Sequence, residues 1–144
     1  MAAFPEYAEH DGLGLAGLIA RKDVTPEEVL EAAISRADAV NPTINAIVHR
    51  MDAEARGRVA ADLPTGPFAG VPFLLKDLYM GYEGAPLGNG SRLWQDYLSP
   101  ADFTYTRRCR AAGLVVFGKT NTPELGIAWT TEPVANGPTR NPWD

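Results

Sequence analysis

Lys76 stands where a lysine could do chemistry, because it closes the apolar run from Gly70 to Asp77. If that run is a buried strand, its carboxyl end lies at the sheet edge where α/β proteins place their sites. A lysine in a low dielectric tends to lose its proton and can then act as a general base. The same pattern also fits a lysine that marks the exit of the strand into solvent. Asp77 would either orient this lysine or cap a turn.

A second lysine, Lys119, lies in the segment 113–120, which matches the G-x-x-x-x-G-K-[ST] pattern of a phosphate-binding P-loop. A P-loop needs the four intervening residues to wrap as a loop with inward N–H groups, whereas Leu114–Phe117 has the composition of a strand. The next helix signal, Thr122-Pro123, comes three residues too late for a phosphate to meet a helix N-terminus. We therefore interpret the segment as a strand followed by a turn, and not as a nucleotide site.

The composition is that of an ordinary soluble globular protein. The 144 residues carry a formal net charge of −5, with 45% hydrophobic and 22% charged residues. An acidic balance argues against a surface that neutralises phosphates, so no nucleic-acid partner is expected. The longest apolar runs fall far short of the roughly 18 residues that a membrane span requires, so no membrane association is expected either. The first twelve residues are acidic, without the pattern of a secretory signal, which favours a cytoplasmic location.

Metal and cofactor sites are not expected. A single cysteine, Cys109, cannot form an internal disulfide, and with only His10 and His49 it cannot complete a zinc site. The sequence therefore predicts neither a structural metal nor a cofactor.

The elements that must position Lys76 can be read from hydrophobic spacing and cap signals. A short helix is expected over 13–22, and a longer one begins after the cap Thr25, with Glu28 in capping-box position, and stops at Asn41-Pro42. Three more helices are expected: 52–61 with Asp52 as its cap, a helix that starts at 100–102 and presents Tyr105, Cys109 and Ala112 on one face, and a short helix from Thr122 through Ala128.

Strands are expected between these helices. The stretch 44–48 is a weak strand pattern that also suits a linker, whereas 70–77 and 114–117 read as buried strands. The glycine-rich segment 79–91 is a loop. A strand, a loop, a helix and a second strand in this order give the rhythm of a parallel or mixed α/β sheet, with helices packed on the sheet.

Three ordered blocks of the sequence resemble the amidase signature family. They read GVPFLLKD at 70–77, RAAGLVVFGKTNTPE at 110–124 and GPTRNPWD at 137–144, and the segments 25–28 and 40–42 are similar to the leading helices of that family. The resemblance implies that residues 1–144 are the N-terminal portion of a single large α/β amidase-signature domain. The expected parts are a helical lead-in over 13–62 and a sheet-forming part with the catalytic lysine over 68–144.

The resemblance also implies a reaction and a role for Lys76. Members of the family hydrolyse amides through a serine, cis-serine, lysine triad, and Lys76 matches the catalytic lysine of that triad. Neutral Lys76 would take a proton from the bridging serine, which takes one from the nucleophilic serine. The two serines belong to a glycine- and serine-rich stretch that follows the Asn-Pro-Trp-Asp block, and Ser35, Ser91 and Ser99 lack its flanking motif. The chain is therefore expected to be an inactive fragment when alone.

Several partners follow from the same resemblance, and several pocket candidates follow from their position in the chain. The expected partners are a small amide substrate, the missing C-terminal part of the same fold and, in the complete enzyme, a second copy in a homodimer. Tyr79 and Tyr82 follow the Lys76 strand, and Trp129, Thr130 and Thr131 follow the 122–128 segment, so each is a candidate for the substrate pocket. Each could equally be a packing residue.

Two alternatives to a simple amidase stay open. The tail, with Thr-Asn-Thr-Pro-Glu-Leu and Thr-Thr-Glu-Pro, favours general amidases and the hydrolases of nylon-type cyclic oligoamides. The A subunit of a glutamine-dependent tRNA amidotransferase usually has Met-Asp-Glu-Phe where this chain has Thr122–Leu125, and it comes second. The other alternative is a non-catalytic chain that pairs with a second chain carrying the serines.

Overall fold

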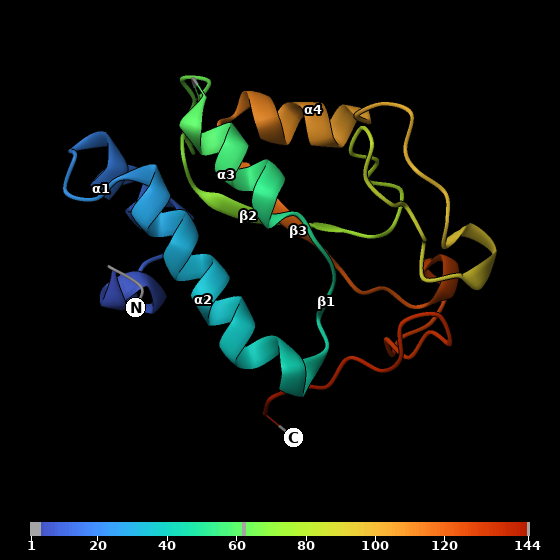
Figure 1. The fold of residues 1–144 in the computed structure, drawn as a ribbon. Helices are drawn as coiled ribbons and strands as arrows, with labels where there is room; N and C mark the ends of the chain where they lie inside the picture. Colours follow the sequence, from blue (N-terminus) through green and yellow to red (C-terminus); the bar gives the residue numbers. More distant parts are fainter. Residues whose placement is uncertain (1–3, 62, 144) are drawn as a thin grey trace. The chain divides into compact units, whose positions relative to one another are not determined.

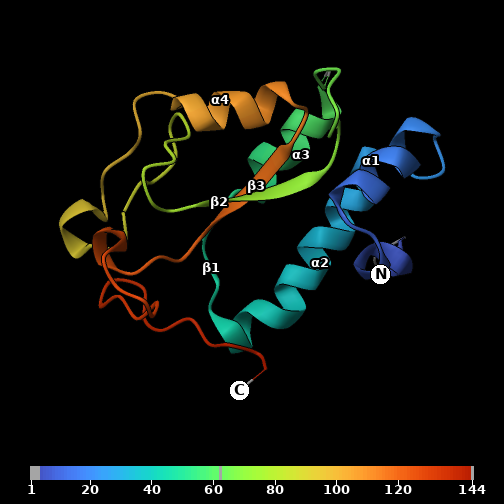
Figure 2. The same cartoon turned by 180° about the vertical axis from the view of Figure 1, so that it is seen from behind.

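The computed structural model describes residues 4–61 and 63–143 (Figures 1 and 2). The chain divides into two compact units, each built from three segments. Unit 1 comprises Met1–Ala39, Met51–Phe73 and Arg108–Phe117, and unit 2 comprises Val40–Arg50, Leu74–Arg107 and Gly118–Asp144. The candidate chemistry at Lys76 lies in unit 2.

The leading helices of unit 1 form as their cap and spacing signals predict. The short 3-10 helix η1 spans Pro5–Glu9, and the helices α1 and α2 span Gly12–Ala20 and Pro26–Ile44. The Thr25 N–H donates to Glu28 Oε2 at 2.8 Å and the Glu28 N–H donates to Thr25 Oγ1 at 3.2 Å, which confirms the capping box. One apolar core cluster of this unit contains Phe4, Leu15, Val29, Ala32 and Val71.

The C-terminal end of α2 corrects a prediction. The helix does not stop at Asn41-Pro42 but continues through Pro42 to Ile44. The side chain of Asn41 holds the chain just beyond the helix, because its Oδ1 accepts from the N–H groups of Ala46 at 2.9 Å and Ile47 at 2.7 Å, and its Nδ2 donates to the Ile47 carbonyl at 2.9 Å. Asn45 then takes the left-handed conformation at φ 51°, which ends the helix.

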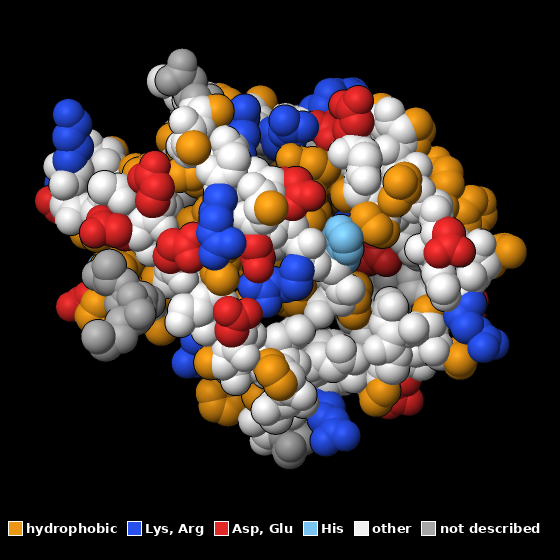
Figure 3. Space-filling view, viewed as in Figure 1, with side chains coloured by type: hydrophobic (Ala, Val, Ile, Leu, Met, Phe, Trp, Pro, Cys, Tyr) orange, Lys and Arg blue, Asp and Glu red, His pale blue; other side chains and the backbone are white. Residues whose placement is uncertain are grey.

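The helix α3 spans Asp52–Ala60, close to the expected range, but its cap differs from the prediction. Met51 is the N-cap and makes no side-chain cap bond, so Asp52 is the first helical residue and adds negative charge to the first turn. Charged side chains of both signs gather over α2 and α3 (Figure 3). One of their ion pairs joins Arg56 Nε to Glu31 Oε1 at 2.6 Å, and that hydrogen bond lowers the pKa of Glu31.

A mixed three-stranded sheet confirms the predicted α/β class. Its strands are β1, Ile47–Arg50, β2, Pro72–Lys76, and β3, Val115–Thr120, in the order β1-β3-β2. β1 pairs antiparallel with β3, with His49 opposite Lys119. β2 runs parallel to β3, because the Val115 N–H donates to the Val71 carbonyl at 2.8 Å and, five residues on, the Asp77 N–H donates to the Thr120 carbonyl at 2.9 Å. The weak strand predicted over 44–48 thus begins later, at Ile47.

The remaining elements differ from their predicted bounds. The helix α4 spans Thr104–Ala111 and so begins later than 100–102, and its buried face is Thr106 with Cys109, whereas Tyr105 is exposed. The segment expected to be helical from Thr122 to Ala128 contains only the 3-10 turn η3, Glu124–Gly126, with Leu125 at φ 52°. A further 3-10 turn, η2, spans Arg92–Trp94, directly after the glycine-rich segment 79–91. Among the described residues, no helix is both long enough and apolar enough to cross a membrane.

Candidate active site

Lys76 is the last residue of β2, and its side chain is exposed. The residues on either side of it are buried: Leu75 has no exposed surface and Asp77 is 5% exposed. Successive side chains of a strand point to opposite faces, so Lys76 faces away from the side on which Leu75 and Asp77 pack. The apolar run thus delivers one accessible amine at the carboxyl end of a strand.

Lys119 has the opposite environment, although it lies on the neighbouring strand. Its side chain is fully buried, and its Nζ lies 2.9 Å from Asp77 Oδ1 and donates to the Pro86 carbonyl at 2.6 Å. Burial lowers the pKa of the Lys119 ammonium, and the charge and hydrogen bond of Asp77 act in the opposite direction. The residues that a P-loop would wrap around a phosphate form β3 instead, so the strand interpretation is confirmed.

Asp77 connects the end of β2 to the glycine-rich loop. Its Oδ1 accepts from the Gly88 N–H at 3.1 Å in addition to its ion pair with Lys119. Two residues further on, the Tyr79 N–H donates to Asn89 Oδ1 at 3.0 Å. The sequence analysis did not predict this ion pair. The signal for it is a lysine and an aspartate at equivalent positions near the ends of two apolar strands.

Two of the three serines of the chain, Ser91 and Ser99, have structural partners. Ser91 caps η2 by accepting from the Leu93 N–H at 3.3 Å, and its hydroxyl donates to Glu124 Oε1 at 2.6 Å. The Ser99 hydroxyl donates to the Ala101 carbonyl at 2.8 Å and is almost fully buried. Ser35 lies on an exposed part of α2. These contacts give Ser91 and Ser99 roles in holding loops.

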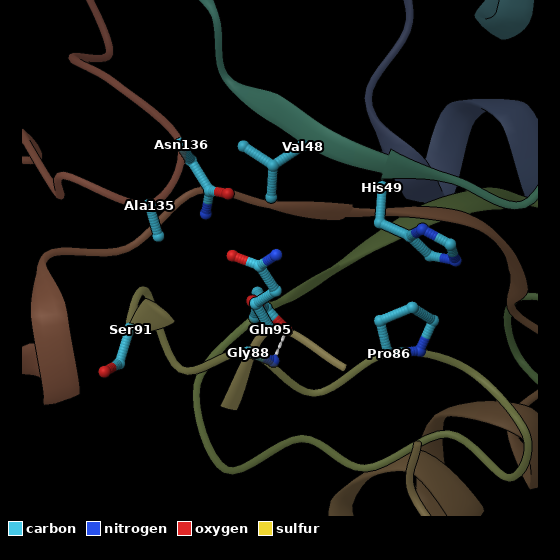
Figure 4. A pocket seen from close by; sticks show the side chains of 9 residues that line it. Val48, His49, Pro86, Gly88, Ser91, Gln95, Ala135 and Asn136 are labelled. Atoms are coloured by element: carbon cyan, nitrogen blue, oxygen red, sulfur yellow. Dashed lines mark hydrogen bonds between the residues drawn. The ribbon is translucent and has the colours of Figure 1, made fainter. Parts of the chain in front are cut away.

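A polar cavity of about 320 Å³ lies in unit 2 (Figure 4). Asn136 and Gln95 are directed toward each other across it (Figure 4). Its described lining contains Asp77 but not Lys76, and consists of Val48, His49, Asp77, Pro86, Gly88, Ser91, Gln95, Ala135 and Asn136. The cavity is therefore on the Asp77 side of β2.

The five predicted pocket residues have different environments. Tyr79 is 62% exposed and has a left-handed backbone at φ 54°, whereas Tyr82 is half-buried. Trp129 and Thr130 are exposed, and the Thr131 carbonyl accepts from the Thr139 N–H at 2.8 Å. None of the five lines the cavity just described within the part of the chain that the structure covers. Their role in substrate binding stays a prediction.

A network of amides holds the C-terminal tail, and sequence reasoning did not anticipate it. Asn121 Nδ2 donates to the Gly137 carbonyl and to Thr139 Oγ1, both at 3.0 Å. Asn45 Nδ2 donates to the carbonyls of Asn136 at 2.8 Å and Pro138 at 3.1 Å. These bonds fix the tail around residues 136–139 to Asn45, at the end of α2, and to Asn121, directly after β3.

The fold and the candidate site define an α/β protein that presents a lysine at the end of a parallel strand. Residues 28–144 match the family model described as Amidase. The chain belongs to the amidase signature family.

Two individual relatives show how similar the chain is to known enzymes of the family. The chain is 43% identical over 136 residues to the 6-aminohexanoate-cyclic-dimer hydrolase of Paenarthrobacter ureafaciens, covering 93% of this chain. It is 42% identical over 137 residues to the A subunit of the glutamyl-tRNA(Gln) amidotransferase of Salinispora tropica, covering 90% of this chain. The chain spans 27% and 28% of the lengths of these relatives.

A solved structure agrees with the sequence comparison. The structure of a 6-aminohexanoate cyclic dimer hydrolase complexed with substrate superimposes with a TM-score of 0.88 at 42% identity. The match covers 94% of this chain and 28% of that one. The predicted fold, the N-terminal part of an amidase-signature enzyme, is therefore confirmed.

Within residues 4–61 and 63–143 there is no cluster of three or more His, Cys, Asp or Glu side chains that could hold a metal ion. The groups that can do chemistry here are the exposed amine of Lys76 and the buried pair of Lys119 and Asp77.

Proposed function

We propose that this chain supplies the lysine base of an amide hydrolase that works through a serine, cis-serine, lysine triad, and that the base is Lys76. The observation that carries the proposal is the contrast between the two strand-end lysines. Lys76 is exposed at the end of β2, whereas the amine of Lys119 is fully buried and already bonded to Asp77 and Pro86. Of these two lysines, Lys76 is the one whose exposure leaves it accessible to a serine from another part of the fold.

The proposed reaction is an acyl transfer in which Lys76 moves protons. Neutral Lys76 takes a proton from the bridging serine as that serine takes one from the nucleophile, whose oxygen attacks the amide carbonyl. The protonated lysine then returns the proton through the bridging serine to the leaving amine. Water hydrolyses the acyl-enzyme by the same route. The two serines would lie in the part of the relatives' length that this chain does not span.

The substrate proposed is a secondary amide of a short aliphatic amino acid. The support is the 43% identity to a hydrolase of the 6-aminohexanoate cyclic dimer. The alternative, an amidotransferase A subunit with partner subunits, is supported by 42% identity to such a protein. Thr122–Leu125, in place of the Met-Asp-Glu-Phe usual in those subunits, favours the hydrolase. Opening of the cyclic dimer to the linear dimer, against release of ammonia from glutamine, separates the two.

The test of the role of Lys76 is Lys76→Ala in the full-length protein that carries this chain. We expect amide hydrolysis to fall to background while circular dichroism and the melting temperature stay unchanged. Lys22→Ala is the matched control, because Lys22 is an exposed lysine that belongs to unit 1. Full activity in a well-folded Lys76→Ala protein would refute the assignment.

The 144-residue chain by itself is proposed to be inactive and to depend on the remainder of the fold. The support is that it spans 27% of a relative's length and that its serines Ser91 and Ser99 hold loops. Turnover of an amide by the purified chain would contradict this. A second chain that restores turnover on mixing would favour the alternative in which the serines lie on a partner.

A further inference from the structure

The buried Lys119 is a costly feature that the proposed proton transfer does not use. An ammonium group without exposure to water loses several kcal/mol of solvation, and well-packed apolar residues often replace such pairs without loss of stability. Here the group keeps Asp77 Oδ1 at 2.9 Å and the Pro86 carbonyl at 2.6 Å. Lys119 lies on β3, which pairs with β2, and β2 ends at the proposed base Lys76. This position points to a role beyond packing.

The partners of the pair converge on the residue that follows Lys76. Asp77 Oδ1 receives the Lys119 ammonium and the Gly88 N–H at 3.1 Å, and the Asp77 N–H donates to the Thr120 carbonyl at 2.9 Å. One carboxylate thus joins the end of β2, the strand β3 and the loop at 86–88. The fit is close, since a Cβ at position 88 would lie 3.0 Å from Asp77 Oδ2.

The same contacts fix the backbone from which the Lys76 side chain departs. The hydrogen bond of the Asp77 N–H holds the peptide plane between residues 76 and 77, and the ion pair holds the side chain of Asp77 on the buried face. The Tyr79 N–H is held by Asn89 from the same loop. Because side chains alternate across a strand, fixing Asp77 on one face fixes the direction of Lys76 on the other.

We propose that the Asp77–Lys119 ion pair, clamped to the loop at Pro86 and Gly88, is a positioning device that holds Lys76 in the geometry its proton transfer needs. The inference rests on the proposed function of Lys76. Lys119 and Asp77 act through Lys76 and touch no substrate. Lys119, the lysine of the P-loop-like motif, thus positions Lys76 and does not bind phosphate.

The test uses three variants of the full-length protein, assayed on the same amide as Lys76→Ala. They are Asp77→Asn, Lys119→Met and the combination of both, which leaves no unpaired charge in the buried site. Because displacing a catalytic group by about 1 Å costs on the order of 100-fold in rate, we expect kcat per folded molecule to fall about 10- to 100-fold. KM should stay within about twofold, because the substrate contacts are unchanged. Arg56→Met, which removes the cation of an exposed ion pair, should leave kcat and KM at the wild-type values.

The variants also separate this inference from the proposed function. A purely structural pair would lower the yield or the melting temperature but not kcat per folded molecule. If the combined variant folds and keeps at least half of the wild-type kcat while Lys76→Ala is inactive, the positioning role is overturned and the role of Lys76 stands. If Lys76→Ala keeps its activity, the proposed function itself fails. Should the combined variant not fold, Asp77→Asn decides by the same criterion, because asparagine keeps an oxygen for the Gly88 N–H.

Discussion

Replacing Lys119 by methionine tests how much free energy of unfolding depends on the buried ion pair. Methionine has nearly the length of lysine but removes both the charge and the hydrogen-bond donors. The Asp77 carboxylate then stays buried without the Lys119 cation, while it still accepts from the Gly88 N–H. Removing one partner of a buried pair costs about 3–5 kcal/mol. We therefore expect a loss of about 4 kcal/mol.

Arg56→Met is the matched control, because it also removes a cation from a carboxylate. The side chains of Arg56 and Glu31 are 51% and 46% exposed, against 0% and 7% for Lys119 and Asp77. Exposed pairs contribute up to about 1 kcal/mol, so burial predicts a severalfold difference between the two variants. Urea denaturation of the full-length proteins, followed by circular dichroism, measures both losses. Equal losses of about 1 kcal/mol or less would refute the reasoning from burial.

The same variant predicts how stability depends on pH. Burial lowers the pKa of Lys119 below 10.5, so between the lowered value and 10.5 the unfolded chain binds more protons than the folded one. The free energy of unfolding then rises with pH in this window. The stability difference between wild type and Lys119→Met should widen as the pH is raised from neutrality toward 10.5, and a difference that shrinks would contradict the lowered pKa.

Three further predictions concern the elements around the site. Asn41→Ala should destabilise the protein by about 1–3 kcal/mol, because the N–H groups of Ala46 and Ile47 lose their acceptor, and the shift of the urea midpoint measures it. Leu75→Ala should lower the free energy of unfolding by about 2–5 kcal/mol in the same assay, since the side chain is fully buried. A loss below about 1 kcal/mol would show that neighbouring side chains fill the space that the leucine leaves. Gly90→Ala should lower the melting temperature more than Gly84→Ala does. Both glycines have positive φ, but only a Cβ at position 90 meets backbone, at 2.5 Å from the Thr122 carbonyl, and equal shifts would argue against that contact.

The sequence by itself determined the features that depend on residues near one another along the chain. The capping box at Thr25 and Glu28, the apolar face of α2 and the strands around Leu75 and Val116 all form where spacing and composition predict them. These signals are local, so they need no knowledge of the rest of the fold. The resemblance of the three blocks to the amidase signature family was likewise confirmed.

Tertiary structure alone decided the features that depend on distant partners. The turn after α2 is held by the side chain of Asn41, and the tail is held by Asn45 and Asn121. Lys76 and Lys119 look alike in sequence, each following an apolar run. Their environments diverge because β2 and β3 pair in a parallel register that puts Asp77 against Lys119 and leaves Lys76 on the other face. Only this pairing separates an accessible amine from a buried ion pair.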